Sequence, residues 1–242
     1  MKKKILENIK TLIYALIIAL FIRSFFFQPF YIPSSSMEPT LLIGDRLFVT
    51  KYSYGYSRHS LPFSPKISNE RYIKKVPKRG DVIVFKTPAD NRTDYIKRLI
   101  GLPGDIVQLL NGDLYLNNEK IFKKRVDFKN IINCGDNAIE VDAYEEMLPN
   151  GKTYTVVYRK DGSMQNTDKF IVPENHYFFM GDNRDCSKDS RYLGSVGYVN
   201  DLNLVGKAKI IFLSNDKNKG SLFNIFKWKQ ILRFNRFFMK IL

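Results

Sequence analysis

The chain opens with one long apolar run. Residues 11–22 read TLIYALIIALFI without a charged side chain, and after Arg23 the apolar character continues to Phe27. A helix over residues 11–27 would span roughly 26 Å at about 1.5 Å per residue, close to the hydrocarbon thickness of a bilayer. A helix that starts at Ile5 is long enough to span the bilayer fully, with the Arg23 side chain extending to the membrane surface. The pattern predicts a transmembrane helix over residues 11–27, preceded by a short stretch at 1–10.

A basic start followed by an apolar run is also typical of a removable signal peptide. No Ala-x-Ala follows the run, and Pro29 lies where a cleavage site needs small residues, so an uncleaved anchor is favoured. The first ten residues contain four lysines, whereas no Lys or Arg occurs between Arg23 and Arg46. The positive-inside rule therefore predicts a cytoplasmic N-terminus and a body on the other side of the membrane.

After the anchor, short segments alternate apolar with polar residues between Gly, Pro, Asn and Asp, which is the pattern of half-buried strands. The clearest such segments are 44–55, 79–88, 94–121 and 152–162. Residues 53–79 read as a long surface excursion, and no long amphipathic helix interrupts the strands before the C-terminus. We predict a mainly β, antiparallel-sheet body.

Residues 117–172 are richer in acidic residues and Asn than their flanks, which suggests an inserted β subdomain. The expected division after the anchor is a first body segment, the insertion, a last body segment and a basic amphipathic tail, over residues 28–116, 117–172, 173–214 and 215–242.

The last stretch, residues 221–242, is rich in aromatic and aliphatic side chains. On a helix its cations would form one stripe, at Lys229, Arg233, Arg236 and Lys240, with apolar residues around most of the circumference. That layout suits a helix in the membrane interface. A terminal segment docked on the protein's own core is the alternative.

Composition is that of a folded protein with an unusual charge. Hydrophobic residues make up 44% and charged residues 26%, which excludes a disordered or collagen-like chain. The net charge of +15 favours an anionic partner, and the 14% of aromatic residues suits either nucleic acid or phospholipid headgroups. The predicted external position of the body disfavours nucleic acid.

Metal and histidine chemistry have little support. The two cysteines, Cys134 and Cys186, are too few for a zinc ribbon or an iron-sulfur cluster, and with two histidines there is no H-E-x-x-H pair. No G-x-S-x-G elbow or phosphate-binding P-loop is present. The cysteines could pair in an oxidising compartment, but their spacing leaves that open.

Chemistry-bearing residues begin just after the anchor, in YIPSSSMEPTL at 31–41, which alone reads as a linker. Four more motifs follow in order: GDRLFVTKYSYG at 44–55, KRGDVIVFK at 78–86, DYIKRLIGLPGD at 94–105 and GDNRDCSKDSRYLG at 181–194. With these five motifs the chain closely resembles the bacterial type I signal peptidases, membrane-anchored Ser/Lys endoproteases that remove signal peptides. The resemblance extends to about Phe212 and is weakest at 56–76 and 117–172.

The resemblance implies a role for each matching residue. Ser36 matches the nucleophile, Lys97 the general base, Ser34 the oxyanion-hole hydroxyl and Ser187 the serine that orients the lysine. A lysine can activate a serine only in its neutral form. For a useful neutral fraction near pH 7, the lysine pKa must fall from about 10.4 to about 7–8, which requires burial. Sequence spacing alone does not place Lys97 near Ser36.

Charged residues next to these motifs are expected to support the site. Within one loop the sign alternates along Asp182, Arg184, Asp189 and Arg191, which suggests an ion-pair network, with a surface charge cluster as the alternative. Arg98, beside Lys97, is a further expected support residue. The pocket residues follow from the family match. Apolar residues expected to line the pockets for an Ala-x-Ala cleavage site are Phe30, Ile32, Pro33, Met37, Leu41, Val84, Tyr95 and Ile96. Cys186 departs from the family, whose loop usually has Asn there.

The resemblance also implies the setting. The expected protein is a serine endopeptidase, a hydrolase without metal or cofactor, that acts as a monomer on the signal peptides of exported preproteins. It would be a single-pass protein of the bacterial inner membrane, with its catalytic domain on the outer, periplasmic side, in contact with anionic phospholipid and with no nucleic-acid partner. A membrane-tethered basic binding protein without catalysis is the alternative of a different class.

Overall fold

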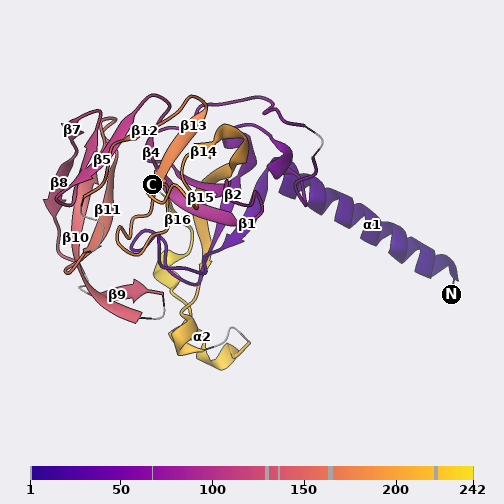
Figure 1. Cartoon of the computed structure of the whole chain (residues 1–242). Coiled ribbons are helices and arrows are strands. Elements are labelled where there is room, and N and C mark those ends of the chain that lie inside the picture. The colour runs from indigo at the N-terminus through magenta and orange to yellow at the C-terminus, as the bar shows by residue number, and fades with distance from the viewer. Residues whose placement is uncertain are drawn as a thin grey trace.

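One long helix projects from a β-rich body in the computed structural model (Figure 1). Helix α1 (Lys2–Phe25) contains the apolar run, and its part Lys3–Phe25 is long and apolar enough to cross a membrane. The helix expected over residues 11–27 is present, but it begins at Lys2 and ends at Phe25, and Phe27 already begins a strand. The structure describes residues 2–66, 68–128, 131–135, 137–162, 166–220 and 223–241.

The largest sheet carries the site. Its strands follow the order β1-β2-β15-β3-β4-β13-β14, and β16 pairs with β15. Their bounds are β1 (Phe27–Tyr31), β2 (Asp45–Thr50), β3 (Val82–Lys86), β4 (Asp94–Gly101), β13 (His176–Met180), β14 (Val199–Asn200), β15 (Leu204–Ser214) and β16 (Met239–Lys240). Every pairing in this sheet is antiparallel, as the alternating pattern predicts.

Two smaller sheets complete the described body. One contains β12, β5, β6 and β7, and the other contains β11, β10 and β8, with β9 paired to β10. Their bounds are β5 (Ile106–Leu110), β6 (Asp113–Leu116), β7 (Glu119–Lys120), β8 (Phe122–Arg125), β9 (Ile131–Cys134), β10 (Asn137–Met147), β11 (Thr153–Arg159) and β12 (Phe170–Ile171). The mainly antiparallel β fold predicted from the sequence is confirmed.

Strand β3 explains how the large sheet is buried on both faces. Successive side chains of a strand point to opposite faces. Val82 and Val84 therefore pack in one hydrophobic cluster with Leu41, whereas Ile83 and Phe85 pack in another on the opposite face. A third cluster joins the large sheet to the smaller ones. Because β3 and β4 are central, the polar side chains of Lys97 and Arg98 on β4 lie inside the protein.

The boundaries of the inserted subdomain stay a prediction. Residues 117–172 contain β7 to β12, most of which form sheets of their own. The segment is nevertheless joined to the body, since β12 pairs with β5 and Val157 forms a bridge with Asn183. Tyr154 and Phe178 also belong to one hydrophobic cluster.

The prediction of one amphipathic helix at the C-terminus is wrong. Its described part contains a single short α-helix, α2 (Trp228–Ile231), between 3-10 turns, and ends in β16. Two of the four cations in the expected stripe bind the body instead: Arg233 donates to the Ile43 carbonyl and Arg236 to the Asp45 carboxylate. Ile231 and Ile241 are buried. The last residues therefore dock on the protein's own core, which was the alternative.

Candidate active site

Ser36 lies in a short turn between β1 and β2. Its side chain is 7% exposed, and the turn is held by Asn183, whose backbone N–H donates to the Ser36 carbonyl at 3.2 Å. The Asn183 side chain also donates to the Ser35 carbonyl at 3.1 Å. A buried amide with two such bonds fixes the backbone on either side of the hydroxyl.

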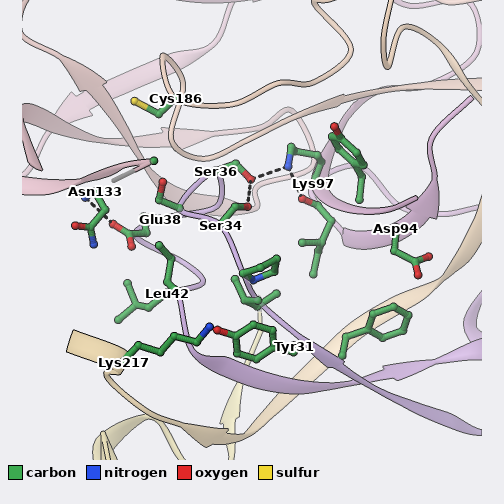
Figure 2. Close-up of a pocket in the computed structure, with 18 of the residues that line it drawn as sticks. Tyr31, Ser34, Ser36, Glu38, Leu42, Asp94, Lys97, Asn133, Cys186 and Lys217 are labelled. Atoms are coloured by element: carbon green, nitrogen blue, oxygen red, sulfur yellow. Dashed lines mark hydrogen bonds between the residues drawn. The ribbon is translucent and has the colours of Figure 1, made fainter. Parts of the chain in front are cut away.

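Lys97 reaches Ser36 from the middle of β4. Its Nζ lies 2.7 Å from Ser36 Oγ and 2.9 Å from the Ile96 carbonyl oxygen. Figure 2 shows the lysine and Ser36 pointing towards one another across the cleft, with Ser34 beside them. The side chain of Lys97 is 3% exposed. The two residues that the sequence could not place together are therefore in direct hydrogen-bond contact.

Burial gives this lysine an unusual proton affinity. Desolvation lowers the pKa of Lys97 to about 8, although the carboxylates of Asp189 and Asp182 act in the opposite direction. At pH 7 roughly one lysine in ten is then neutral, about 300 times the fraction expected for a pKa of 10.5. The amine is thus able to accept a proton near neutral pH.

The two other serines lie near Ser36. Ser34 Oγ is 3.3 Å from Ser36 Oγ and is exposed to the cleft. Ser187 is buried and packs against Gly181. A Cβ atom added to Gly181 would lie 2.2 Å from Ser187 Oγ and 2.4 Å from the Ser36 carbonyl oxygen, so position 181 has no room for a side chain. The Ser187 hydroxyl is near enough to lower the pKa of Asp189, but it makes no well-aligned hydrogen bond among the described residues.

The five predicted support residues are buried, and they form separate ion pairs. Arg98 binds Asp182 through two bonds of 2.8 Å, and Arg191 binds Asp189 at 2.8 and 2.9 Å. Arg184 does not pair with either aspartate, because both of its amino groups contact Glu146, at 2.6 and 2.5 Å. Bidentate pairs of this kind fix the loop 181–191 next to Ser36.

A cleft of about 1170 Å³ opens over Ser36 and Lys97. Of the predicted pocket residues, those that line it are Phe30, Ile32, Pro33, Val84, Tyr95 and Ile96. Met37 and Leu41 do not line the cleft. Both are fully buried in the hydrophobic cluster that also contains Ile32 and Val84.

The two cysteines, whose pairing the sequence leaves open, form a disulfide. The bond joins Cys134, at the end of β9, to Cys186 in the loop 181–191, with their Cα atoms 5.4 Å apart. It attaches the β9–β10 hairpin to the site, and Cys186 itself lines the cleft.

Sequence reasoning missed several residues that hold the site. Glu146 lies in the predicted insertion and is buried against Arg184, and Thr40 donates to the Asp182 carboxylate at 2.5 Å. Asn183 was inside a quoted motif, but its role in the Ser36 turn depends on contacts between distant segments. A buried acid in a polar segment gives no signal in the sequence alone.

Comparison with known proteins identifies the family. The chain matches the family described as signal peptidase, peptidase S26, over residues 5–213. Signal peptidase I of Rickettsia bellii (strain OSU 85-389) is 41% identical over 249 residues, which cover 96% of this chain and 84% of that protein. Signal peptidase I of Rickettsia typhi (strain Wilmington) is 38% identical over 257 residues, which cover 99% and 95%.

Among solved structures, a signal peptidase I from Enterococcus faecalis V583 is 27% identical and covers 55% of this chain and 97% of its own, with a TM-score of 0.32. The family match and the relatives extend over nearly the whole chain, from the apolar helix through the last long strand. The chain belongs to the signal peptidase I family of S26 peptidases, and its N-terminal helix is the membrane anchor of such an enzyme.

Proposed function

We propose that this protein cleaves signal peptides from exported preproteins after Ala-x-Ala sites, with Ser36 as nucleophile and Lys97 as general base. The observation that carries the proposal is the 2.7 Å contact between Lys97 Nζ and Ser36 Oγ inside a buried site. A serine and an adjacent neutral base are the parts that covalent acyl transfer requires. Both residues come from one chain, so a monomer contains the whole dyad.

The reaction begins when Ser36 Oγ attacks the carbonyl carbon before the scissile bond, while its proton passes to neutral Lys97. In this proposal the Ser34 hydroxyl and the Ser36 backbone N–H stabilise the oxyanion. Protonated Lys97 then gives its proton to the departing amine, so that the C–N bond breaks and an acyl-enzyme remains. Lys97, neutral again, takes a proton from water as the water attacks the ester. It then gives that proton to Ser36 Oγ as the bond between the acyl carbon and Oγ breaks, which releases the new C-terminal carboxyl group and restores the Ser36 hydroxyl and neutral Lys97.

Ser187 retains its proposed role as the residue that orients Lys97. Its buried hydroxyl lies against the Ser36 backbone without a well-aligned partner, so it is available to the amine when substrate enters. The ion pairs of Arg98 and Arg191 support the same loop and strand. The apolar wall at Phe30 and Ile96 accepts small side chains before the scissile bond.

Activity should rise with pH. Because only neutral Lys97 accepts the Ser36 proton, kcat/KM should increase about tenfold per pH unit below the Lys97 pKa and level off above about 8. Cleavage of a peptide substrate measured from pH 5.5 to 9.5 tests this. A profile that is flat through pH 7 would contradict a base with this pKa.

The proposed reaction is tested with the full-length protein in detergent and a preprotein that contains one Ala-x-Ala site. Mass spectrometry should find a single new N-terminus directly after the second Ala. Changing that Ala to Trp should block cleavage, because the proposed pocket before the scissile bond accepts small side chains. Binding of the preprotein without any cleavage would favour a non-catalytic tethered protein.

For the orientation, we propose that the N-terminus is cytoplasmic and that the body lies on the periplasmic side of the inner membrane. The four lysines before the apolar run support this direction. The disulfide between Cys134 and Cys186 also suits an oxidising compartment. A body outside the cytoplasm is where signal peptides emerge and where chromosomal nucleic acid is absent.

We also propose that the α2 region touches the bilayer surface. The segment extends from the body in Figure 1, and Phe226 is 95% exposed beside Ile225 and Trp228, which are also exposed. Lys227 and Lys229 supply positive charge at the same place. Exposed aromatic and aliphatic side chains with adjacent lysines are typical of contact with anionic lipid.

Trp228 reports on this contact, because it is the one tryptophan in the sequence. In vesicles of anionic lipid, brominated acyl chains should quench its fluorescence. Phe226→Asp should weaken insertion of the segment by about tenfold or more, because burying a Phe contributes about 1.5–3 kcal/mol. Phe122→Asp is the matched control, since this exposed phenylalanine lies on β8. Absence of quenching in the wild type would contradict the contact.

A further inference from the structure

The cleft continues on both sides of Ser36. On one side its walls are Phe30 and Ile32 at β1 and Ile96 on β4. On the other side they are Asn133 of the β9–β10 hairpin, Glu38 and Cys186 (Figure 2), and the lining also includes their chain neighbours Gly135 and Lys188. Figure 2 shows Asn133 and Cys186 across Ser36 from Lys97 and Asp94. We call the second side the hairpin end.

The anchor indicates which part of a substrate occupies each side. Helix α1 ends at Phe25 and β1 begins at Phe27, so the side formed by Phe30 and Ile32 continues from the membrane-spanning segment. The apolar core of a signal peptide precedes the scissile bond and lies in the bilayer. Residues before the bond therefore approach along β1, and residues after it leave past the hairpin end.

The hairpin end is fixed in place at three points. The backbone N–H of Asn133 donates to Glu38 Oε2 at 3.3 Å, and its carbonyl accepts a bond of 3.3 Å from the Asn183 side chain. The disulfide ties the next residue, Cys134, to Cys186. Glu38 and Asn183 also belong to the segments that position Ser36, so the hairpin is connected to the nucleophile turn.

The side chain of Asn133 is available for binding. Its backbone makes both of the bonds described above, and its carboxamide has no hydrogen bond to any residue that the structure describes. A carboxamide offers one acceptor and two donors, which match the C=O and N–H groups of an extended peptide. Gly135 follows at the turn with φ 63°, and a Cβ there would meet open space.

We propose that the hairpin end is the subsite for the first residues of the mature protein, and that Asn133 binds their backbone through its carboxamide. The inference rests on the proposed cleavage reaction and adds the part of the substrate beyond the scissile bond. Recognition of backbone rather than side chains suits a segment whose sequence differs from one preprotein to the next. Asn133 is a binding residue here and takes no part in proton transfer.

The test compares two substrates that share the same signal-peptide end. The long substrate continues for six residues after the scissile bond, whereas the short one ends there in an anilide leaving group. Asn133→Ala in the full-length protein should lower the ratio of kcat/KM for long over short substrate by about 3- to 10-fold, the effect of one lost hydrogen bond. Asn137→Ala is the matched control, because Asn137 pairs with Cys134 in the same hairpin and does not line the cleft. Its ratio should equal that of the wild type.

The outcomes separate the two proposals. An unchanged ratio in Asn133→Ala would overturn the subsite, whether both substrates are slowed equally or neither is affected. An equal fall in Asn137→Ala would also overturn it, because the effect would then belong to the hairpin as a whole. If the wild-type protein cleaves neither substrate, the proposed reaction itself is wrong.

Discussion

Ser36→Ala and Lys97→Met should each lower kcat for preprotein cleavage by about 10⁴- to 10⁶-fold. The kcat of the double variant should be about the same as that of the less active single variant. Residues that act as one unit lose their contributions together, so that their effects do not add. The Ser36 hydroxyl is useful only if a base removes its proton, and every later proton transfer by Lys97 Nζ, 2.7 Å away, depends on the acyl-enzyme that Ser36 forms. The measurement is single-turnover cleavage of a preprotein by detergent-solubilised enzyme.

Lys152→Met is the control for this pair. Burial also lowers the pKa of Lys152 to about 8, but its Nζ donates to the Gly80 carbonyl at 2.8 Å, outside the cleft. A variant without this amine should keep most of its activity. The contrast shows that a low pKa alone does not make a general base and that contact with the nucleophile is also required. Residual cleavage by Lys97→Met near the wild-type rate would mean that another group accepts the proton.

Local patterns predicted several strands well, because a short apolar or alternating run between turn residues is a signal within the strand itself. The segments at 79–88 and 152–162 contain β3 and β11, and the apolar run at 11–27 contains most of the described anchor helix. Helical periodicity failed at the C-terminus for a physical reason. The cations at 229, 233, 236 and 240 do have helical spacing, but the guanidinium groups of Arg233 and Arg236 bind acceptors on the body.

The site depended on information that is not local. Ser36 and Lys97 were found by their motifs, but their contact arises from the β3–β4 register, in which Ile83 lies opposite Lys97, and from the turn that Asn183 holds. The disulfide could not be chosen from the spacing, because two cysteines far apart in sequence meet only if the hairpin folds over the loop. Glu146 was missed for the same reason: its partner, Arg184, lies far away in the sequence, in the loop 181–191.

Glu146→Ala should lower the free energy of unfolding by about 3–5 kcal/mol, because it leaves the Arg184 guanidinium buried without its carboxylate. Both side chains are 1% exposed, and the hydroxyls of Tyr154 and Tyr158 also bind Glu146, at 2.8 and 3.3 Å. The expected fall in the midpoint of thermal unfolding is roughly 6–20 °C for a chain of this size.

Circular dichroism of the detergent-solubilised protein measures this change, and Glu140→Ala is the control. Glu140 forms an ion pair of 2.6 Å with Lys160, but both side chains are largely exposed, so its loss should leave the midpoint nearly unchanged. Replacing both buried partners, as Glu146→Leu with Arg184→Met, should recover much of the loss, since no unpaired charge remains inside. A Glu146→Ala midpoint equal to that of Glu140→Ala would show that the Arg184 pair does not hold the loop 181–191 in place.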